Sequence, residues 1–206
     1  MENFNKNFDV SCETFDKLKS YVDLLNEWQN KFNLVSKNSL PEVWTRHIAD
    51  SAQLYKFLDD DVSLVYDFGS GAGFPALVLA IMAKEKNPHI KFKLVESITK
   101  KTLYLNTVKN KIKLNNVEVF NDRVEKLNLP KADVITARAM TALENLFEYA
   151  FMFTDKHTKM IFPKGKSFED ELTKAKQKWN FKYTIYPNEF CDDGVVLIIE
   201  NLRRKK

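Results

Sequence analysis

Apolar side chains recur at every third or fourth position over residues 15–32, which is the stripe of an amphipathic helix. A second helix is predicted over residues 41–58, because Pro41 suits a first helical turn and apolar residues gather on one side of the segment after it. Beyond that helix, short apolar runs of strand length alternate with helical segments. The chain is therefore predicted to have an N-terminal helical extension, residues 1–60, followed by an α/β domain, residues 61–206.

The second part of the chain alternates regularly between strands and helices. Strands are predicted over 64–68, 90–95, 117–120, 134–137 and 160–162, and helices over 75–86, 99–114, 143–153 and 168–179. Two last strands, 183–186 and 195–200, are joined by a segment too short for a crossover helix, so they are predicted to form an antiparallel hairpin. The expected fold class is α/β, with a seven-stranded, mostly parallel sheet and an antiparallel end. The basic residues 203–206 are expected to form a solvated tail.

Length and composition indicate the number of domains and the cellular compartment. Its 206 residues fit one domain, and 44% hydrophobic residues suffice for a packed core. No segment approaches the ~20 apolar residues that span a bilayer, and the start lacks the basic and apolar regions of a signal peptide, so we expect a cytoplasmic protein without a membrane partner. Cys12 and Cys191 are too isolated to suggest a disulfide framework or a metal pair, and no metal is expected.

Three of the five glycines, Gly69, Gly71 and Gly73, follow the strand 64–68 at alternate positions. Glycine accepts backbone angles that other residues avoid, and it lets a ligand lie against the main chain. The dinucleotide fingerprint Gly-x-Gly-x-x-Gly fails here, because its third glycine falls on Phe74. The spacing therefore disfavours a nicotinamide oxidoreductase, although that class stays an alternative.

Arginine is rare in this lysine-rich chain. Of 32 basic residues only five are arginines, and three of those, Arg46, Arg123 and Arg138, lie in the interior of the sequence. A guanidinium binds two acceptors at once, a task that lysine cannot copy, although chance remains a rival explanation. Arg138 follows the predicted strand 134–137, so it is expected at the carboxyl edge of the sheet, facing a ligand. The net charge of +4 is compatible with a polyanionic partner without requiring one.

The pattern Gly-x-Gly-x-Gly after the first strand, with Glu96 at the end of the second, resembles class I S-adenosylmethionine-dependent methyltransferases. The terminal hairpin also matches that class, and nicotinamide-binding domains lack it. The resemblance implies that the loop passes under the methionine part of S-adenosylmethionine. A carboxylate at the position of Glu96 can accept hydrogen bonds from both ribose hydroxyls. S-adenosylmethionine is therefore the expected cofactor.

Seven further motifs occur in an ordered set. They are Asn33-Leu34-Val35-Ser36, Arg46-His47-Ile48-Ala49-Asp50-Ser51, the stretch from Asp67 to Pro75, Glu96-Ser97 with Lys100-Lys101, Arg123-Val124-Glu125, Ala137-Arg138-Ala139 and Lys164-Gly165. Together they resemble the bacterial glucose-inhibited division protein B family over about residues 18 to 200. The sequence departs from the family at Ala76, where a second glycine is usual, and at Pro163, where leucine or a similar residue is more common. The added Cβ at Ala76 is expected to narrow the cofactor pocket.

The family methylates N7 of a guanine in 16S ribosomal RNA, so the resemblance implies this reaction, and 16S ribosomal RNA or the small ribosomal subunit as partner. It assigns the cofactor to Gly69, Gly71, Gly73, Phe74, Glu96, Val124, Glu125 and Arg138, and RNA contacts to Arg46, His47, Ser51, Arg123 and Lys164. Arg138 is also the expected catalytic residue, holding guanine O6. For His47 a packed role and an RNA contact stay open. The helical extension would cap the site on the RNA side of a monomeric enzyme.

Guanine N7 carries a lone pair and no proton, so this reaction needs positioning and exclusion of water and no strong general base. Three alternatives stay open: methylation of another RNA, a small molecule or a protein; a nicotinamide oxidoreductase; and a nucleotide-binding module without turnover. The choice of guanine, and whether free RNA or a ribosomal particle is the substrate, are not determined by the sequence.

Overall fold

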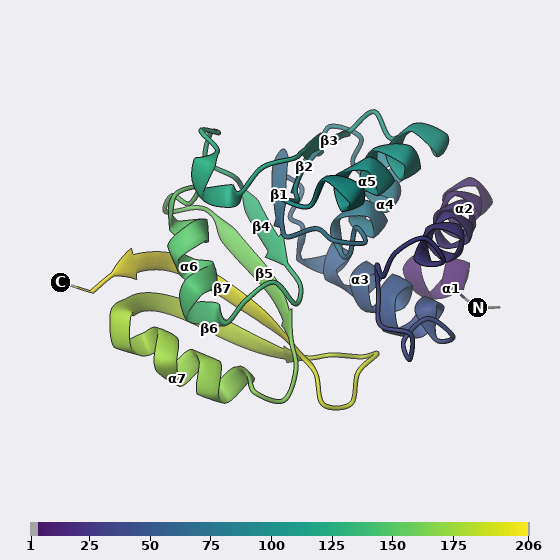
Figure 1. Cartoon of the computed structure of the whole chain (residues 1–206). Coiled ribbons are helices and arrows are strands. Elements are labelled where there is room, and N and C mark those ends of the chain that lie inside the picture. Colours follow the sequence, from purple (N-terminus) through teal and green to yellow (C-terminus); the bar gives the residue numbers. More distant parts are fainter. Residues whose placement is uncertain (1–3, 206) are drawn as a thin grey trace.

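The computed structural model describes residues 4–205 and confirms the α/β class (Figure 1). Seven strands form one sheet in the order β3-β2-β1-β4-β5-β7-β6. The strands are β1 Leu64–Phe68, β2 Lys91–Val95, β3 Val117–Phe120, β4 Val134–Ala137, β5 Lys159–Lys164, β6 Trp179–Pro187 and β7 Val195–Arg204. The α-helices are α1 Phe4–Phe8, α2 Cys12–Gln29, α3 Asp50–Ala52, α4 Ala76–Lys86, α5 Thr99–Lys111, α6 Leu143–Phe151 and α7 Phe168–Lys178. A π-helix, η1 Trp44–Ala49, and two 3₁₀ segments, η2 Gln53–Phe57 and η3 Val124–Lys126, complete the elements.

The strands β1 to β5 run parallel, and β7 lies antiparallel between β5 and β6. From β1 the chain builds outward through β2 and β3, and then crosses to β4 on the other side of β1. The loops after β1 and β4 therefore diverge at the carboxyl edge of the sheet, and this divergence creates the crevice in which such folds bind ligands.

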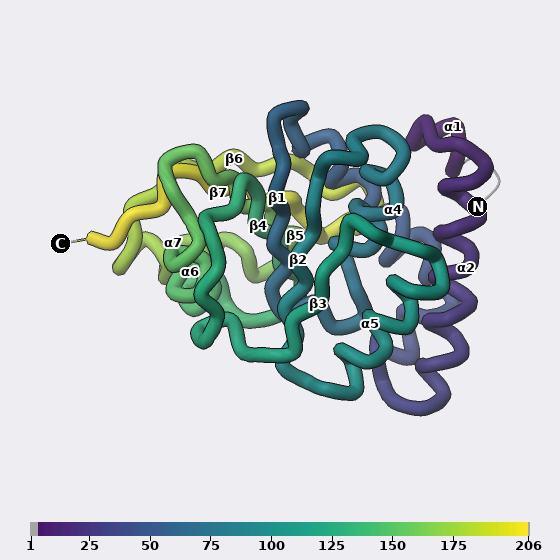
Figure 2. Tube along the Cα trace, turned by 90° about the horizontal axis from the view of Figure 1, so that it is seen from above, coloured from purple at the N-terminus to yellow at the C-terminus, as the bar shows by residue number. Residues whose placement is uncertain are grey.

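Side chains of each strand alternate between two hydrophobic clusters, one on each face of the sheet. On β1, Val65 belongs to the cluster that contains α4 and α5, whereas Tyr66 and Phe68 belong to the cluster that contains α6 and α7. Figures 1 and 2 show these two helix pairs on opposite sides of the sheet, with α1 and α2 outside α4 and α5. The central strands of the sheet are thus buried on both faces, as their almost continuous apolar sequences require, whereas the edge strand β6 is largely exposed.

The helical extension packs directly on the α/β part. Leu18, Tyr21 and Leu25 of α2 are fully buried in the same cluster as α4 and α5. Ser11 caps α2 by accepting from the Thr14 N–H, and both residues also bond Glu85 of α4. The division at residue 60 stays an interpretation, since the hydrophobic core continues across it.

The predicted elements are present, but several differ in winding or length; β6, for example, begins four residues before its predicted start. The second helix is wound irregularly, as η1, α3 and η2 in succession; π-helical turns of this kind often occur at functional sites. The short helix α1 was not predicted, because its five residues are too few for a periodic pattern. Arg203 and Arg204, expected in a solvated tail, are exposed but belong to β7, where they pair with Asn180 and Trp179; Lys206 lies outside the described residues.

Cys12 and Cys191 are both free and exposed. Within residues 4–205, none of the helices combines the length and the apolar character needed to cross a bilayer.

Candidate functional site

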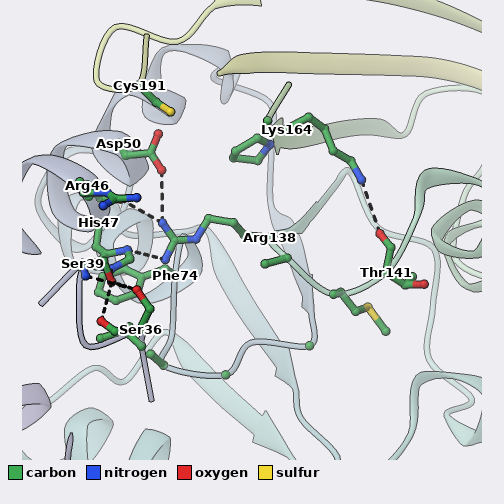
Figure 3. A pocket seen from close by; sticks show the side chains of 18 of the residues that line it. Ser36, Ser39, Arg46, His47, Asp50, Phe74, Arg138, Thr141, Lys164 and Cys191 are labelled. Atoms are coloured by element: carbon green, nitrogen blue, oxygen red, sulfur yellow. Dashed lines mark hydrogen bonds and ion pairs between the residues drawn. The ribbon is translucent and has the colours of Figure 1, made fainter. Parts of the chain in front are cut away.

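A cleft of about 970 Å³ opens at the carboxyl edge of the sheet, between the loops that follow β1, β4 and β5. The helical extension and the loop between β6 and β7 complete its walls (Figure 3). Its position is the switch point at which open α/β sheets bind ligands. The extension contributes Ser36, Ser39, Arg46, His47 and Asp50, the loop after β1 contributes residues 69–72 and Phe74, and the loop after β4 contributes residues 138–142.

The three glycines after β1 all have positive φ angles: 65° at Gly69, 53° at Gly71 and 98° at Gly73. A Cβ on Gly73 would lie 2.4 Å from Leu77 Cδ1. A Cβ on Gly69 would lie 2.9 Å from Met140 Cγ, in the loop after β4. Gly71 differs, since the nearest atom to its added Cβ would be the Gly69 oxygen at 3.7 Å. Gly69 and Gly73 are therefore required by the tight turn itself. The backbone at Gly71 is open toward the cleft, where a ligand can lie against the main chain.

Glu96, at the end of β2, ties this loop to the sheet. Its side chain is buried, and Oε2 accepts from the Gly71 N–H at 2.9 Å while Oε1 accepts from the Ile98 N–H at 2.8 Å. A carboxylate has about four acceptor positions, so each oxygen keeps a lone pair for a further donor. A pair of ribose hydroxyls can donate to these two acceptors, and the predicted contact to the cofactor stays a prediction.

Asp67 lies at the base of the loop, and we did not single it out as a site residue from the sequence. It is 1% exposed; Oδ1 accepts from the Thr136 hydroxyl at 2.7 Å, and Oδ2 has no hydrogen-bond partner among residues 4–205. Burial raises the pKa of Asp67 to about 7. A buried acid with an unpartnered oxygen is costly to ionise, so this group makes stability depend on pH.

We expect Asp67→Asn to change that dependence in a defined direction. The unfolded carboxyl titrates near 3.8 and the folded one near 7, so between these values the folded protein holds a proton that the unfolded chain has released. The wild type therefore loses stability as pH rises through this window, and the loss levels off above it. The unfolding free energy of Asp67→Asn minus that of wild type should therefore increase by roughly 1.4 kcal/mol for each pH unit within this window. Urea titrations from pH 4 to 8 measure this difference, and a constant difference would contradict the account.

Arg138 follows β4 and reaches across the cleft to the extension (Figure 3). Its Nη1 donates to Asp50 Oδ2 at 3.2 Å and to the Arg46 carbonyl at 3.3 Å, and its Nη2 donates to His47 Nδ1 at 2.9 Å. The guanidinium carbon lies 4.9 Å from the centre of the Phe74 ring, within cation–π range. The structure places Arg138 in the cleft, where the sequence predicted it, and its part in the reaction stays a prediction.

The His47 ring stacks on Phe74, with ring centres 4.9 Å apart and 18° between the planes. A guanidinium can only donate, so the Nδ1 that faces Arg138 carries no proton and Nε2–H donates to Ser39 Oγ at 2.9 Å. Burial, helped by the charges of Arg138 and Arg46, lowers the pKa of His47 to about 3. His47 is thus neutral near pH 7 and orients Arg138. An RNA contact by its ring stays a prediction.

Asp50 is a second carboxylate that sequence reasoning missed. Its Oδ1 accepts from Asn188 Nδ2 at 2.6 Å and Gln53 Nε2 at 3.0 Å, and its Oδ2 accepts from Arg138. It therefore joins the extension, the loop after β4 and the loop between β6 and β7. A signal was available, since Asp50 lies three residues after His47, and that spacing places both on one helix face.

The residues expected to bind RNA differ in how accessible they are. Arg46 and Arg123 are exposed, and their carboxylate neighbours, Glu42 at 3.6 Å and Glu125 at 4.0 Å, are exposed as well. Exposed pairs of this kind hold weakly, so both guanidinium groups can reach a polyanion.

Lys164 and Ser51 are held by the protein itself. Lys164 is 11% exposed, and its Nζ lies 2.7 Å from Glu171 Oε2, although the residue does line the cleft. Ser51 is 1% exposed and its hydroxyl donates to the His47 carbonyl. In this arrangement Ser51 presents no group to RNA, because its hydroxyl is buried in the helical segment that carries His47.

Val124 and Glu125 lie in η3, which follows β3 and is preceded by Arg123. Val124 is buried and Glu125 is exposed. The glycine loop follows β1, Glu96 follows β2 and η3 follows β3, so these residues lie at neighbouring strand ends. This placement is compatible with the predicted contact of Val124 and Glu125 with the cofactor. Gly73 belongs to the loop but does not line the cleft, unlike its neighbour Phe74.

The two departures from the family pattern are both accommodated. Ala76 begins α4, is fully buried and does not line the cleft, so its Cβ does not narrow the space described here. Pro163 lies in β5 beyond the last residue that pairs with β4, so its missing N–H interrupts no bond to that strand. Among residues 4–205 no three His, Cys, Asp or Glu side chains are grouped as a metal site.

Comparisons with known proteins identify the fold and the family of this chain. Solved structures with similar folds include a SAM-dependent methyltransferase from Aquifex aeolicus, with a TM-score of 0.61 and 18% identity over 78% of this chain and 94% of that one. Another is an O-methyltransferase from Bacillus cereus in complex with SAH, with a TM-score of 0.60 and 14% identity over 88% of this chain and 91% of that one. At such identities the likeness shows the fold alone.

Sequence relatives are more similar and cover almost the whole chain. A ribosomal RNA small subunit methyltransferase G from Cereibacter sphaeroides is 39% identical over 94% of both chains. One from Rickettsia prowazekii is 34% identical over 95% of this chain and 98% of its own. The profile of the GidB family, described as rRNA small subunit methyltransferase G, matches residues 14–190. The resemblance seen in the sequence motifs is thereby confirmed, and the chain belongs to the rRNA small subunit methyltransferase G family.

Proposed function

We propose that this protein transfers a methyl group from S-adenosylmethionine to N7 of a guanine in 16S ribosomal RNA. The chain belongs to this family, and one observation carries the proposal: Arg138 and the backbone of the glycine loop line the same cleft. At one end the open face of Gly71 offers space for the donor, and Glu96, which bonds the Gly71 N–H but does not itself line the cleft, offers acceptors beside it. Arg138 and the extension offer donors for a base at the other.

When bound, S-adenosylmethionine would supply a methyl group on a positively charged sulfur. The residues of the chain then need to hold N7 in line with that methyl at ~3–3.5 Å and to keep water out. No proton has to leave the guanine nitrogen. A neutral His47 and a buried Asp67, neither placed to exchange protons with a base in the cleft, suit such a reaction.

Arg138 can recognise guanine while held in its present place. A guanidinium has five N–H donors, and the three hydrogen bonds to Asp50, Arg46 and His47 leave Nε–H and one hydrogen of Nη2 for a further acceptor. Arginine often binds guanine through O6 and N7 together. Because N7 must stay free to attack, we assign Arg138 to O6.

Arg46 and Arg123 are expected to contact phosphate. Replacing both with alanine should weaken binding to small-subunit RNA and reduce the slope of log affinity against log salt by roughly 0.7–0.9 for each phosphate that is no longer neutralised. Lys91→Ala with Lys131→Ala is the matched control, because both lysines are exposed at the amino edge of the sheet, away from the cleft. Filter binding at four salt concentrations measures the slopes. Equal slopes for the arginine double variant and wild type would remove these residues from the interface.

The substrate class is tested by transfer of labelled methyl from S-adenosylmethionine. Incorporation is measured with 16S ribosomal RNA, with small subunits, with a total protein extract and with a metabolite extract. We expect label in the RNA, in free or ribosomal form, and none in the other two. Label in protein or metabolites alone would favour the alternative methyltransferase classes.

A cytoplasmic monomer remains our expectation for the enzyme.

A further inference from the structure

Tyr21 connects the helical extension to the glycine loop. It lies in the middle of α2, is fully buried, and its hydroxyl donates to the Ala72 carbonyl at 2.6 Å, across 51 positions of sequence. Its ring packs against Phe74 with centres 5.3 Å apart. Burial raises the pKa of Tyr21 well above its usual value, so the hydroxyl keeps its proton and remains a donor.

The Ala72 carbonyl depends on this bond. Ala72 is 6% exposed, and within residues 4–205 no donor other than the Tyr21 hydroxyl bonds its oxygen. The loop leaves little room around the contact, because a Cβ on Gly73 would lie 3.0 Å from the Tyr21 oxygen. The bond therefore fixes the plane of the peptide between Ala72 and Gly73.

That peptide is part of the backbone that approaches the cleft. Gly73 N–H donates to the Ser70 carbonyl at 2.6 Å, and Gly71 N–H donates to Glu96 at 2.9 Å. The start of the loop is bonded to the Val95 carbonyl of β2, and beyond that point Glu96 of the sheet holds Gly71 and Tyr21 of the extension holds Ala72. Without the bond from Tyr21, the buried Ala72 oxygen would have to turn toward another donor and carry the neighbouring peptides with it.

We propose that Tyr21 is a positioning residue for the methyl donor, so that the N-terminal extension builds the cofactor site as well as the wall that faces RNA. This inference rests on the proposed function, since it takes S-adenosylmethionine as the ligand of the loop. It assigns the extension a role that does not involve RNA. A loop pre-set by Tyr21 binds the donor without first reordering its own backbone.

The test is Tyr21→Phe, which removes one oxygen and keeps the buried ring. Calorimetry with S-adenosylhomocysteine, in the absence of RNA, should give a Kd about tenfold higher than wild type, the effect of removing one hydrogen bond at a preorganised site. In steady-state assays with 16S ribosomal RNA, the KM for the donor should rise by a similar factor. The kcat at saturating donor should stay within about twofold, since binding is affected and the reacting groups are unchanged.

Two matched tyrosines separate positioning from stability. Tyr66 is equally buried, and its hydroxyl donates to the Pro130 carbonyl at 2.9 Å, near the amino edge of the sheet. Tyr66→Phe should lower the melting temperature and leave the Kd unchanged. The Tyr55 hydroxyl donates to Asn87 Oδ1 at 2.6 Å, and Tyr55 does not line the cleft, so Tyr55→Phe should also leave the Kd unchanged. Faster exchange of the Gly71 and Gly73 amides in Tyr21→Phe alone gives a second readout.

The outcomes are distinct. A higher Kd and faster loop exchange in Tyr21→Phe, with neither change in the two controls, support the proposal. A Tyr21→Phe protein that melts earlier but binds S-adenosylhomocysteine as wild type does would overturn it, because the tyrosine would then be structural only. Equal increases in Kd for Tyr21→Phe and Tyr66→Phe would also overturn it. If the wild-type protein itself failed to bind S-adenosylhomocysteine, the proposed methyl donor would be refuted. That result is distinct from the others because it does not involve the variants.

Discussion

Arg138→Lys is expected to lower kcat/KM for methyl transfer to 16S ribosomal RNA by about 100-fold, the scale of losing one preorganised donor at a reacting group. Lysine keeps the charge, but it cannot reach Asp50, His47 and the Arg46 carbonyl together while also offering a planar pair of donors to a base. His47 would also lose the guanidinium that holds its ring. Single-turnover rates with labelled donor measure the effect on the methyl-transfer step.

Arg203→Lys is the matched control for that variant. Arg203 is an exposed arginine on β7, outside the cleft, and the same substitution there should leave the rate within about twofold. If Arg138→Lys kept both turnover and affinity for S-adenosylhomocysteine within a factor of two of wild type, the assignment of Arg138 to the base would be wrong.

Gly73→Ala is expected to abolish detectable binding of S-adenosylhomocysteine and to destabilise the fold. The new Cβ would lie 2.4 Å from Leu77 Cδ1 and 3.0 Å from the Tyr21 oxygen, at a residue whose φ is 98°. Left-handed strain and overpacking together should cost about 2–4 kcal/mol, and each kcal/mol lowers the melting temperature of a chain of this size by roughly 2–4 °C. Thermal melts with and without the ligand measure both effects.

Gly165→Ala provides the comparison, because its added Cβ would meet nothing within 4 Å and its φ lies outside the left-handed region. We expect its melting temperature and its affinity for S-adenosylhomocysteine to stay near those of wild type. A Gly73→Ala protein that melted and bound the ligand as Gly165→Ala does would show that the loop tolerates a side chain, against the account given for its glycines.

The parts of the fold that rest on local patterns were predictable. The predicted limits of β1, β3 and β4 agree with the structure, because short apolar runs bounded by turn residues indicate buried strands. The glycine loop was predictable as well, since its backbone angles need glycine in any context. The place of β7 between β5 and β6 was not, because a hairpin pattern does not say which of its strands pairs with the rest of the sheet.

The parts of the site that rest on distant contacts could not be read from the sequence. Tyr21 carries no local signal that sets it apart, and only the packing of α2 on α4 and α5 brings its hydroxyl to Ala72. Asp50 is in a similar position, because Asn188 lies 138 residues away along the chain. The pair of Lys164 and Glu171 spans only seven residues, but it depends on the conformation of the turn between β5 and α7, and the RNA contact of Lys164 stays a prediction. Sequence reasoning thus found the loop, Glu96, His47 and Arg138, and missed Tyr21 and Asp50, which also hold the loop and Arg138 in place.

The central claim is that this chain methylates guanine N7 in 16S ribosomal RNA, and mapping that modification in cells with and without the protein tests it most directly. Small-subunit RNA is treated with borohydride and aniline, which cleave the strand at N7-methylated guanine, and the break is located by primer extension. We expect one break that is present with the wild-type protein, absent without it, and restored by Arg203→Lys but greatly reduced with Arg138→Lys. An identical set of breaks with and without the protein would contradict the account.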